Sequence, residues 1–186
     1  MRRLLFSLLC LQGLNATAAT TELNLFYFSD SMTYASVPST YSRTSWDLNF
    51  GVDLNKKGTL VLGWNYGSLS FEDNPGEATK LTVTDMGPKF TYYFDKNLSW
   101  PISFTYNLIT RGKYSSGATE AEQRGTSMKF EFGYTPQISE SWYAGAKLNY
   151  YKASFNEEVV DDTALAKVTN GRTVIYPSFT LLYRWN

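Results

Sequence analysis

The segment from Trp46 to Leu54 alternates apolar and polar side chains at every position. A period of two is the repeat of a β-strand that has one face in an apolar medium and the other in a polar medium. Lys56-Lys57-Gly58 then forms a turn signal, and a second alternating segment runs from Leu60 to Gly67. The two segments together predict a β-hairpin with a short connection.

The same alternation recurs along the rest of the chain. Further alternating segments cover Asp85 to Phe94, Trp100 to Leu108, Met128 to Tyr134, Trp142 to Tyr150 and Ile175 to Trp185. A less regular one covers Glu22 to Tyr34, where Phe26 and Phe28 interrupt the polar face. The total of eight is an even number, as single-chain bacterial barrels require. The predicted fold class is therefore all-β, an eight-stranded antiparallel up-and-down transmembrane β-barrel.

Connections of two kinds alternate between these strands. Those after the second, fourth and sixth strands are short turns, whereas long polar links are expected near 35–45, 72–79, 115–125 and 156–171. This asymmetry is typical of an outer-membrane barrel, with short periplasmic turns, long exterior loops and, here, both termini in the periplasm. The long links carry many acids: Glu72, Asp73, Glu77, Glu120, Glu122, Glu157, Glu158, Asp161 and Asp162.

Aromatic residues fall near the two ends of the apolar faces, where lipid head groups would lie. The candidates at the short-turn end are Phe94, Trp100, Tyr134, Trp142, Tyr183 and Trp185. Those toward the other end are Trp46, Tyr66, Tyr106 and Tyr150. The alternative is a soluble lipocalin-like ligand-binding barrel with its apolar faces inside. It is disfavoured because the interior of an eight-stranded barrel is too narrow for so many large rings.

The first 18 residues are expected to form a cleaved signal peptide, followed by a barrel domain over 19–186. Arg2 and Arg3 precede a short apolar run, and Ala16 to Ala19 supplies a small-residue cleavage site. A transmembrane helix is the alternative, but the run is shorter than the roughly 20 residues that a span requires. Cys10 is the only cysteine, and the bulky Leu9 before it disfavours a lipoprotein site.

Charged residues on the polar faces are expected to point into the lumen. They are Asp47, Asp53, Asp85, Lys89, Arg111, Lys129, Glu131, Lys147 and Arg184. Because an unpaired buried charge is costly, we expect these residues to pair across the barrel and to plug it. The alternative is a narrow or gated channel for ionic or hydrophobic solutes, whose selectivity these charges would set.

Residue types needed for common catalytic sites are missing from the chain. It contains no histidine, so triads lack their proton shuttle and zinc sites lack their commonest ligand. A carboxylate pair of Asp47 and Asp53 remains a formal possibility, although paired interior charges explain these acids more simply. We therefore expect a protein that is not an enzyme, without cofactor or metal. With 17 basic and 17 acidic residues, nucleic acid is not an expected partner either.

The chain resembles the small eight-stranded outer-membrane proteins of the OmpA-barrel, OmpX and OmpW type. Its last strand, from Tyr176 to Asn186, looks like their terminal assembly signal, with aromatics at Tyr183 and Trp185; it departs from the pattern at Thr180 and at Asn186. The resemblance implies insertion by the barrel-assembly machinery. It also implies contact with outer-membrane lipid and lipopolysaccharide.

The expected role is structural or surface-interacting, through long acidic loops that bind divalent cations or meet a protein or cell-surface partner. Basic residues near the strand tops are candidates for contact with lipopolysaccharide phosphates: Lys80, Lys113, Lys152 and Arg172. OmpW-like transport is the alternative. A lateral opening and an apolar lumen, with Phe26 and Phe28 facing inward, would favour it.

Overall fold

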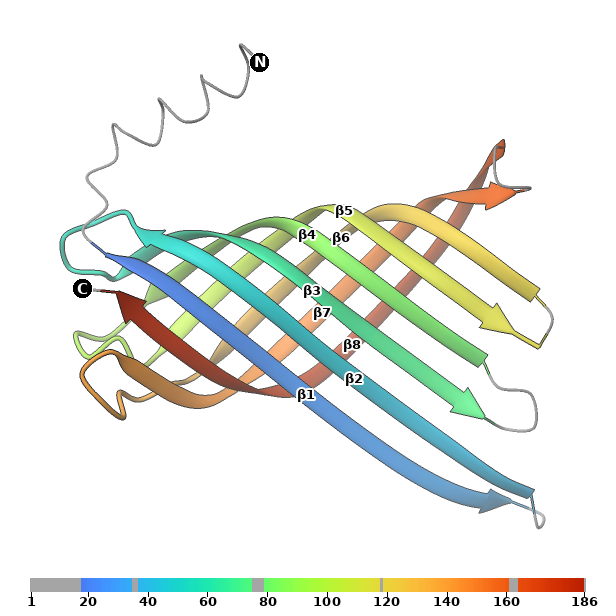
Figure 1. Cartoon of the computed structure of the whole chain (residues 1–186), viewed down its shortest axis with the longest axis horizontal. Coiled ribbons are helices and arrows are strands. Elements are labelled where there is room, and N and C mark those ends of the chain that lie inside the picture. Colours follow the sequence, from blue (N-terminus) through green and yellow to red (C-terminus); the bar gives the residue numbers. More distant parts are fainter. Residues whose placement is uncertain (1–17, 35–36, 75–78, 118, 161–163, 186) are drawn as a thin grey trace.

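The strands close into one barrel (Figure 1). A computed structural model describes residues 18–34, 37–74, 79–117, 119–160 and 164–185. Every strand pairs antiparallel with its neighbours in the chain, and the first pairs with the last. The bounds are β1 (Ala19–Tyr34), β2 (Val37–Asp53), β3 (Leu60–Asn74), β4 (Thr79–Tyr93), β5 (Pro101–Ser116), β6 (Thr119–Tyr134), β7 (Trp142–Val160) and β8 (Ala164–Trp185). The predicted fold class is confirmed, whereas residues 1–17 of the predicted signal peptide lie outside the described residues.

Period-two alternation decides which side chains enter the barrel. In β5, Ser103, Thr105 and Asn107 are buried inside, and Ile102, Phe104 and Tyr106 are exposed on the outer face. Small polar residues fit the narrow interior of an eight-stranded barrel, and the large rings are left outside. No helix within the described ranges is long and apolar enough to cross a bilayer.

The short turns, the start of β1 and the end of β8 gather at one end of the barrel (Figure 1). Gly58 adopts a positive φ of 66° in the β2–β3 turn, a conformation that glycine adopts at little cost. In the β4–β5 turn, the carboxylate of Asp95 accepts hydrogen bonds from the backbone N–H groups of Ser99 and Trp100. Local turn chemistry therefore fixes this end of the molecule.

The other end, called here the wide end, differs from expectation. The predicted long loops are mostly strand: β1 and β2 pair as far as Tyr34 and Val37, and residues 119–125 belong to β6. These segments are rich in Ser, Thr and Tyr, and cross-strand pairing satisfies their backbone groups. Of the predicted loop acids, Glu77, Asp161 and Asp162 lie outside the described residues.

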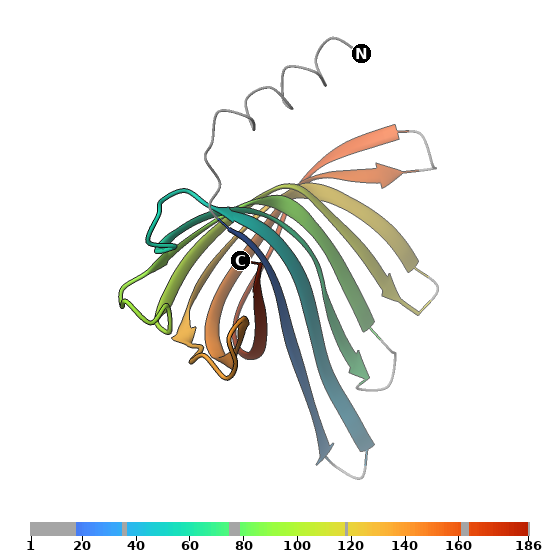
Figure 2. The same cartoon turned by 60° about the vertical axis from the view of Figure 1, so that its left-hand side comes forward.

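The pairing of β1 with β8 stops partway along the barrel. Their register runs from Ala19↔Trp185 to Leu25↔Phe179, whereas β1 continues paired with β2 and β8 continues paired with β7. The β1–β2 and β7–β8 hairpins consequently point apart at the wide end (Figures 1 and 2). We call the unpaired stretch of these two strands the seam.

Apolar residues exchange faces toward the wide end. In β3, Leu62, Trp64 and Tyr66 are exposed outside, but farther along the same strand Leu69 and Phe71 are buried inside. The same exchange in other strands builds an upper apolar layer within the barrel: Leu69, Phe71, Val83, Tyr151, Ala153, Phe155, Val174 and Tyr176, with Phe26 and Leu81 packed against it. The wide end therefore has an apolar core, and the half near the short turns has a polar one.

Candidate functional site

Six charged side chains form a central network in the barrel interior: Glu22, Asp47, Lys89, Lys129, Glu131 and Lys147. Lys89 Nζ lies 2.6 Å from Glu22 Oε1 and 2.7 Å from Glu131 Oε2. Lys147 Nζ lies 2.7 Å from the other carboxylate oxygen of Glu22. Glu22 thus binds two lysines from opposite sides.

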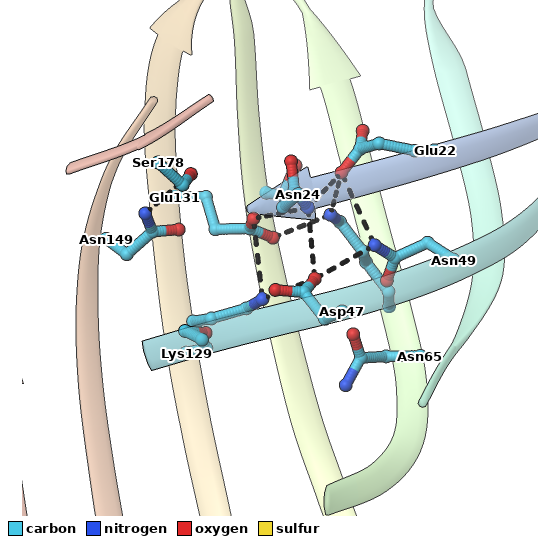
Figure 3. Close-up of polar contacts among 12 residues, drawn as sticks. Glu22, Asn24, Asp47, Asn49, Asn65, Lys129, Glu131, Asn149 and Ser178 are labelled. Carbon is cyan, nitrogen blue, oxygen red and sulfur yellow. Dashed lines mark hydrogen bonds and ion pairs between the residues drawn. The ribbon is translucent and has the colours of Figure 1, made fainter. Parts of the chain in front are cut away.

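Lys129 completes the network. Its Nζ lies 2.8 Å from Asp47 Oδ1 and 3.5 Å from Glu131 Oε1 (Figure 3). The three acids and three lysines come from five strands and balance in charge. All six side chains are buried, with residue exposures of 5% or less. Burying such charges is costly unless they are paired, and each of the six lies within ion-pair distance of an opposite charge.

Buried amides extend the central network. The Asn24 side chain donates to Glu22 at 2.7 Å and to Asp47 at 3.0 Å, and its oxygen accepts a hydrogen bond from Thr180 (Figure 3). Asn49 donates to Asp47 at 3.1 Å. These amides share acceptor oxygens with the lysines, because Glu22 Oε1 also accepts from Lys89 and Asp47 Oδ1 also accepts from Lys129, so that contacts run from wall to wall across the barrel.

A second ion pair lies near the short turns. Arg184 Nη1 lies 3.1 Å from Asp53 Oδ2, and Arg184 Nη2 donates to the carbonyl oxygen of Gly58 at 2.9 Å. The same guanidinium lies 5.0 Å from the ring centroid of Tyr93. A small apolar cluster of Val61, Tyr93, Tyr143 and Leu182 packs inside this end of the barrel.

Asp85 is held by hydroxyl groups. Its Oδ1 accepts from Thr110 at 2.7 Å and from Ser127 at 2.8 Å, and its Oδ2 accepts from the Tyr151 hydroxyl at 2.8 Å. No cation lies within ion-pair distance of this carboxylate among the described residues. The predicted lumen charges therefore form three arrangements: the central network, the Asp53–Arg184 pair and the hydroxyl-bound Asp85.

The prediction that Arg111 faces the lumen is wrong. β5 carries one extra residue relative to each neighbouring strand, between Thr105 and Ile109 against β4 and between Asn107 and Thr110 against β6. Leu108 and Ile109 are both exposed on the outer face. Such a β-bulge reverses the faces that follow it. Arg111 is consequently exposed on the outer face of the barrel.

Little empty space remains between the polar side chains. One cavity of about 20 Å³ lies beside Asp47, Asp85 and Lys129, and another of about 20 Å³ lies beside Glu22 and Lys89. Each volume is sufficient for about one water molecule.

The predicted aromatic residues lie on the outer face, and most are exposed. At the short-turn end, Trp100 and Tyr134 ring centroids are 4.7 Å apart, and Tyr183 lies 4.8 Å from both Trp142 and Trp185. Phe94 at this end is exposed as well. These contacts form two aromatic clusters on the outer face at the short-turn end.

The remaining predicted aromatics lie farther along the outer face. Trp46 and Tyr66 ring centroids are 5.6 Å apart, Tyr106 is exposed on β5, and Tyr150 is exposed on β7. Beyond these rings the outer face becomes polar, with Ser70, Thr82 and Lys113 among its residues. The apolar outer band therefore has an aromatic boundary toward each end.

Several interior residues were not predicted. Glu22 was missed because Phe26 and Phe28 obscured the polar face of β1, yet its apolar neighbour Leu23 marks the outer face. Tyr151 and Tyr176 were missed because their strands exchange faces. In both cases, the alternate positions occupied by apolar residues indicate which face of the strand points into the barrel.

Phe26 lies inside, with its ring centroid 5.2 Å from that of Tyr176, whereas Phe28 is 45% exposed. Of the four basic residues considered for lipopolysaccharide phosphates, Arg172 faces inward, with its guanidinium carbon 4.2 Å from the Phe71 ring centroid. The described residues contain no group of three or more acidic, histidine or cysteine side chains placed to hold a metal ion.

No family model and no curated protein match the sequence. Among solved structures, Neisserial surface protein A (NspA) is 14% identical, with a TM-score of 0.50 over 90% of this chain and 95% of that chain. The chain has the fold of a small eight-stranded outer-membrane barrel. Ail of Yersinia pestis, solved with the heparin analogue sucrose octasulfate, is 10% identical, with a TM-score of 0.48 over 90% of this chain and 99% of that one. The outer membrane protein OprG from Pseudomonas aeruginosa is 10% identical, with a TM-score of 0.42 over 91% and 96%.

Proposed function

We propose that this chain is an integral outer-membrane protein without enzymatic activity, with a structural or surface-interacting role and a lumen that is plugged. The single observation that carries the proposal is the charge-balanced central network. It fills the interior of a barrel whose outer wall, at the same level, exposes large apolar side chains such as Phe104, Phe130 and Leu148. Polar inside and apolar outside is the arrangement that a bilayer selects.

The outer aromatic residues support the placement in a membrane. Trp and Tyr prefer the interface between acyl chains and head groups. We assign the ends of the apolar band to the two interfaces, with the short turns and both termini in the periplasm. Tyr183 and Trp185 serve as the terminal signal for the barrel-assembly machinery. The lipid of the outer membrane, including lipopolysaccharide, then surrounds the band, with Lys80, Lys113 and Lys152 as candidate phosphate contacts.

The wide end is the surface offered to the exterior. Its strands carry Glu72, Glu120 and Glu122, of which Glu72 lies 3.9 Å from Lys80 and Glu122 lies 3.5 Å from Arg124. Exposed ion pairs of this kind contribute little to stability. Their acids therefore remain free to contact a protein or cell-surface partner at small cost.

Membrane placement is tested by fractionation combined with heat-modifiable gel migration. We expect the protein in the outer-membrane fraction, and we expect boiled and unboiled samples to migrate differently because the folded barrel resists detergent. Recovery from the soluble periplasm, with no difference on boiling, would contradict the proposal. It would indicate a lipocalin-like barrel instead.

The plug is tested by planar-bilayer recording with the folded protein. We expect no reproducible single-channel openings, because paired side chains occupy the lumen. The matched variant is Glu22→Gln with Lys147→Met, which removes both ion pairs of Glu22 and keeps the charge balance. Steady openings of the unmodified protein, altered in size by this variant, would show that the network lines a pore.

A second candidate function is lateral passage of an apolar solute through the seam. It is favoured by the end of β1–β8 pairing at Leu25↔Phe179 and by the inward position of Phe26 next to Tyr176. A disulfide between Tyr27→Cys and Pro177→Cys, the positions that lie opposite each other when the β1–β8 register is continued, would close the seam, with Cys10→Ser as its background. Uptake of an apolar solute that falls on oxidation and recovers on reduction would support this function, and unchanged uptake would refute it.

A further inference from the structure

Two arginines, Arg43 of β2 and Arg172 of β8, meet inside the wide end. The Cζ atom of Arg43 lies 5.7 Å from the ring centroid of Phe71, and that of Arg172 lies 4.2 Å from the same centroid. Because both distances end on one ring, the two guanidinium carbons are at most about 10 Å apart. Phe71 itself is buried in the upper apolar layer, so the two guanidinium groups pack against an apolar surface. The ring of Tyr41 holds Arg43 from another direction, at 4.6 Å.

Neither guanidinium has an acidic partner within the described residues: no carboxylate oxygen lies within 4.0 Å of their nitrogens. Asp30 of β1 and Asp73 of β3 are both register partners of Tyr41, two residues from Arg43, yet neither forms an ion pair with it. The Nε of Arg43 is also buried without a hydrogen-bond partner. Two nearby cations repel each other, and a buried donor without an acceptor is costly. A bound anion would remove both costs.

A hollow of about 450 Å³ adjoins Arg172. Leu81 and Phe155 supply apolar wall, and Glu158 lines one side. Glu158 already accepts a hydrogen bond of 2.9 Å from Gln123, which occupies part of its hydrogen-bonding capacity. The volume lies within the range of small-molecule pockets. A ligand held at the two arginines therefore has space for a body of modest size.

We propose that Arg43 and Arg172 bind a small amphipathic anion. Its carboxylate, sulfate or phosphate ester bridges the two guanidinium groups, and its aromatic or alkyl body fills the hollow beside Arg172. Guanidinium groups offer forked N–H donors that match such oxyanions, and the Phe71 face holds both cations in place. This site is independent of the plug, because it lies above the upper apolar layer while the central network closes the lumen below.

The anion has two possible routes to the site. A dissolved molecule enters from the wide end, whereas an anionic lipid enters through the seam, since Phe28 of β1 is the register partner of Arg43 at a height where β1 and β8 are unpaired. Either route supplies an oxyanion that carries an apolar body. The experiment separates them.

The test uses ¹⁹F NMR of 4-fluorophenyl phosphate with the full barrel in dodecyl maltoside, and 4-fluorobenzyl alcohol as the neutral comparison. We expect the phosphate to bind and the alcohol to bind far more weakly. Arg43→Gln with Arg172→Gln should weaken phosphate binding about tenfold or more, because charge-assisted hydrogen bonds are lost. The double lysine variant should retain part of the affinity. Arg124→Gln, on the outer face, is the matched control and should change nothing.

Heat-modifiable migration shows that each variant is folded. Equal phosphate affinity of the unmodified protein and the double glutamine variant, or equal binding of the alcohol, would overturn the proposal. The source of the anion is read in phosphatidylcholine nanodiscs with and without phosphatidylglycerol. Loss of probe binding when phosphatidylglycerol is present indicates a lipid anion, and unchanged binding indicates a dissolved one. Both results support the oxyanion site.

Discussion

Lys89 is the most informative residue to change, because it joins two carboxylates that come from different strands. Lys89→Met keeps most of the side-chain volume and removes the charge from between Glu22 and Glu131, at 2.6 Å and 2.7 Å. Glu22 keeps Lys147 at 2.7 Å, but Glu131 keeps only Lys129, at 3.5 Å. The variant therefore leaves Glu131 buried with a weaker partner.

The size of the effect follows from this geometry. Removing one partner of a buried ion pair costs about 3–5 kcal/mol, and the remaining Lys129 contact places Lys89→Met near the lower limit, at about 3 kcal/mol. Lys89→Met with Glu131→Gln restores the charge balance and leaves the Glu22–Lys147 and Asp47–Lys129 pairs intact. Since replacing both partners of a buried pair is often neutral, the double variant should lie within about 1.5 kcal/mol of the unmodified protein.

The assay is equilibrium urea unfolding in lipid vesicles, followed by tryptophan fluorescence and by the fraction that keeps folded gel mobility. The control is Lys96→Met in the exposed β4–β5 turn, which should change the free energy of unfolding by less than about 0.5 kcal/mol. A double variant that is destabilised by as much as the single variant, or by more, would refute the reasoning. It would show that the two residues do not act as an ion pair.

Three further predictions concern the walls of the barrel and use the same unfolding assay. Gly125→Ala should cost about 1–3 kcal/mol, because a Cβ there would clash with the backbone carbonyl oxygen of Ser154; an unchanged stability would contradict this close approach. Trp100→Ala should cost at least about 1 kcal/mol through lost ring contacts and Trp100→Phe clearly less, and equal costs would argue against the aromatic cluster. Leu69→Asp should cost more than about 3 kcal/mol and its outer-face neighbour Ser70→Asp less than about 0.5 kcal/mol; similar costs would contradict the exchange of faces.

The strands and their faces were predictable because alternation is a direct consequence of the strand repeat. The alternate residues Ser103, Thr105 and Asn107 in β5 and Lys129 and Glu131 in β6 lie inside as the pattern indicates. The central network follows from these faces, since lysines and acids that share a narrow interior must pair. Which lysine contacts which acid was not predictable, because cross-barrel partners depend on stagger between strands and not on spacing along one strand.

Arg111 shows where alternation fails. One extra residue at Leu108 and Ile109 leaves two consecutive apolar residues on the outer face, and every later position in β5 reverses. A bulge depends on pairing with both neighbouring strands, so a single strand does not reveal it. Two adjacent apolar residues in an otherwise alternating segment are its one trace in the sequence.

The wide end was predicted as loops because its outer residues are polar. The apolar residues of the same segments, such as Leu69 and Phe71 in β3, alternate with these polar ones but occupy the opposite parity to Trp64 and Tyr66. Where the apolar residues of one strand move from the outward to the inward positions, the medium outside the barrel changes from apolar to polar. The upper apolar layer and the arginine pair were not predicted, because this change of faces was not recognised in the sequence.

We infer that the apolar outer band faces lipid. Collision measurements on a nitroxide at position 104 test this placement. The label is attached to Phe104→Cys in a Cys10→Ser background, with Arg111→Cys as the comparison, and the barrel is placed in lipid vesicles. The account predicts frequent collisions with oxygen and rare collisions with a water-soluble nickel chelate at position 104, and the reverse order at position 111. A label at position 104 that collides freely with the nickel chelate would contradict the account, because that face would then lie in water.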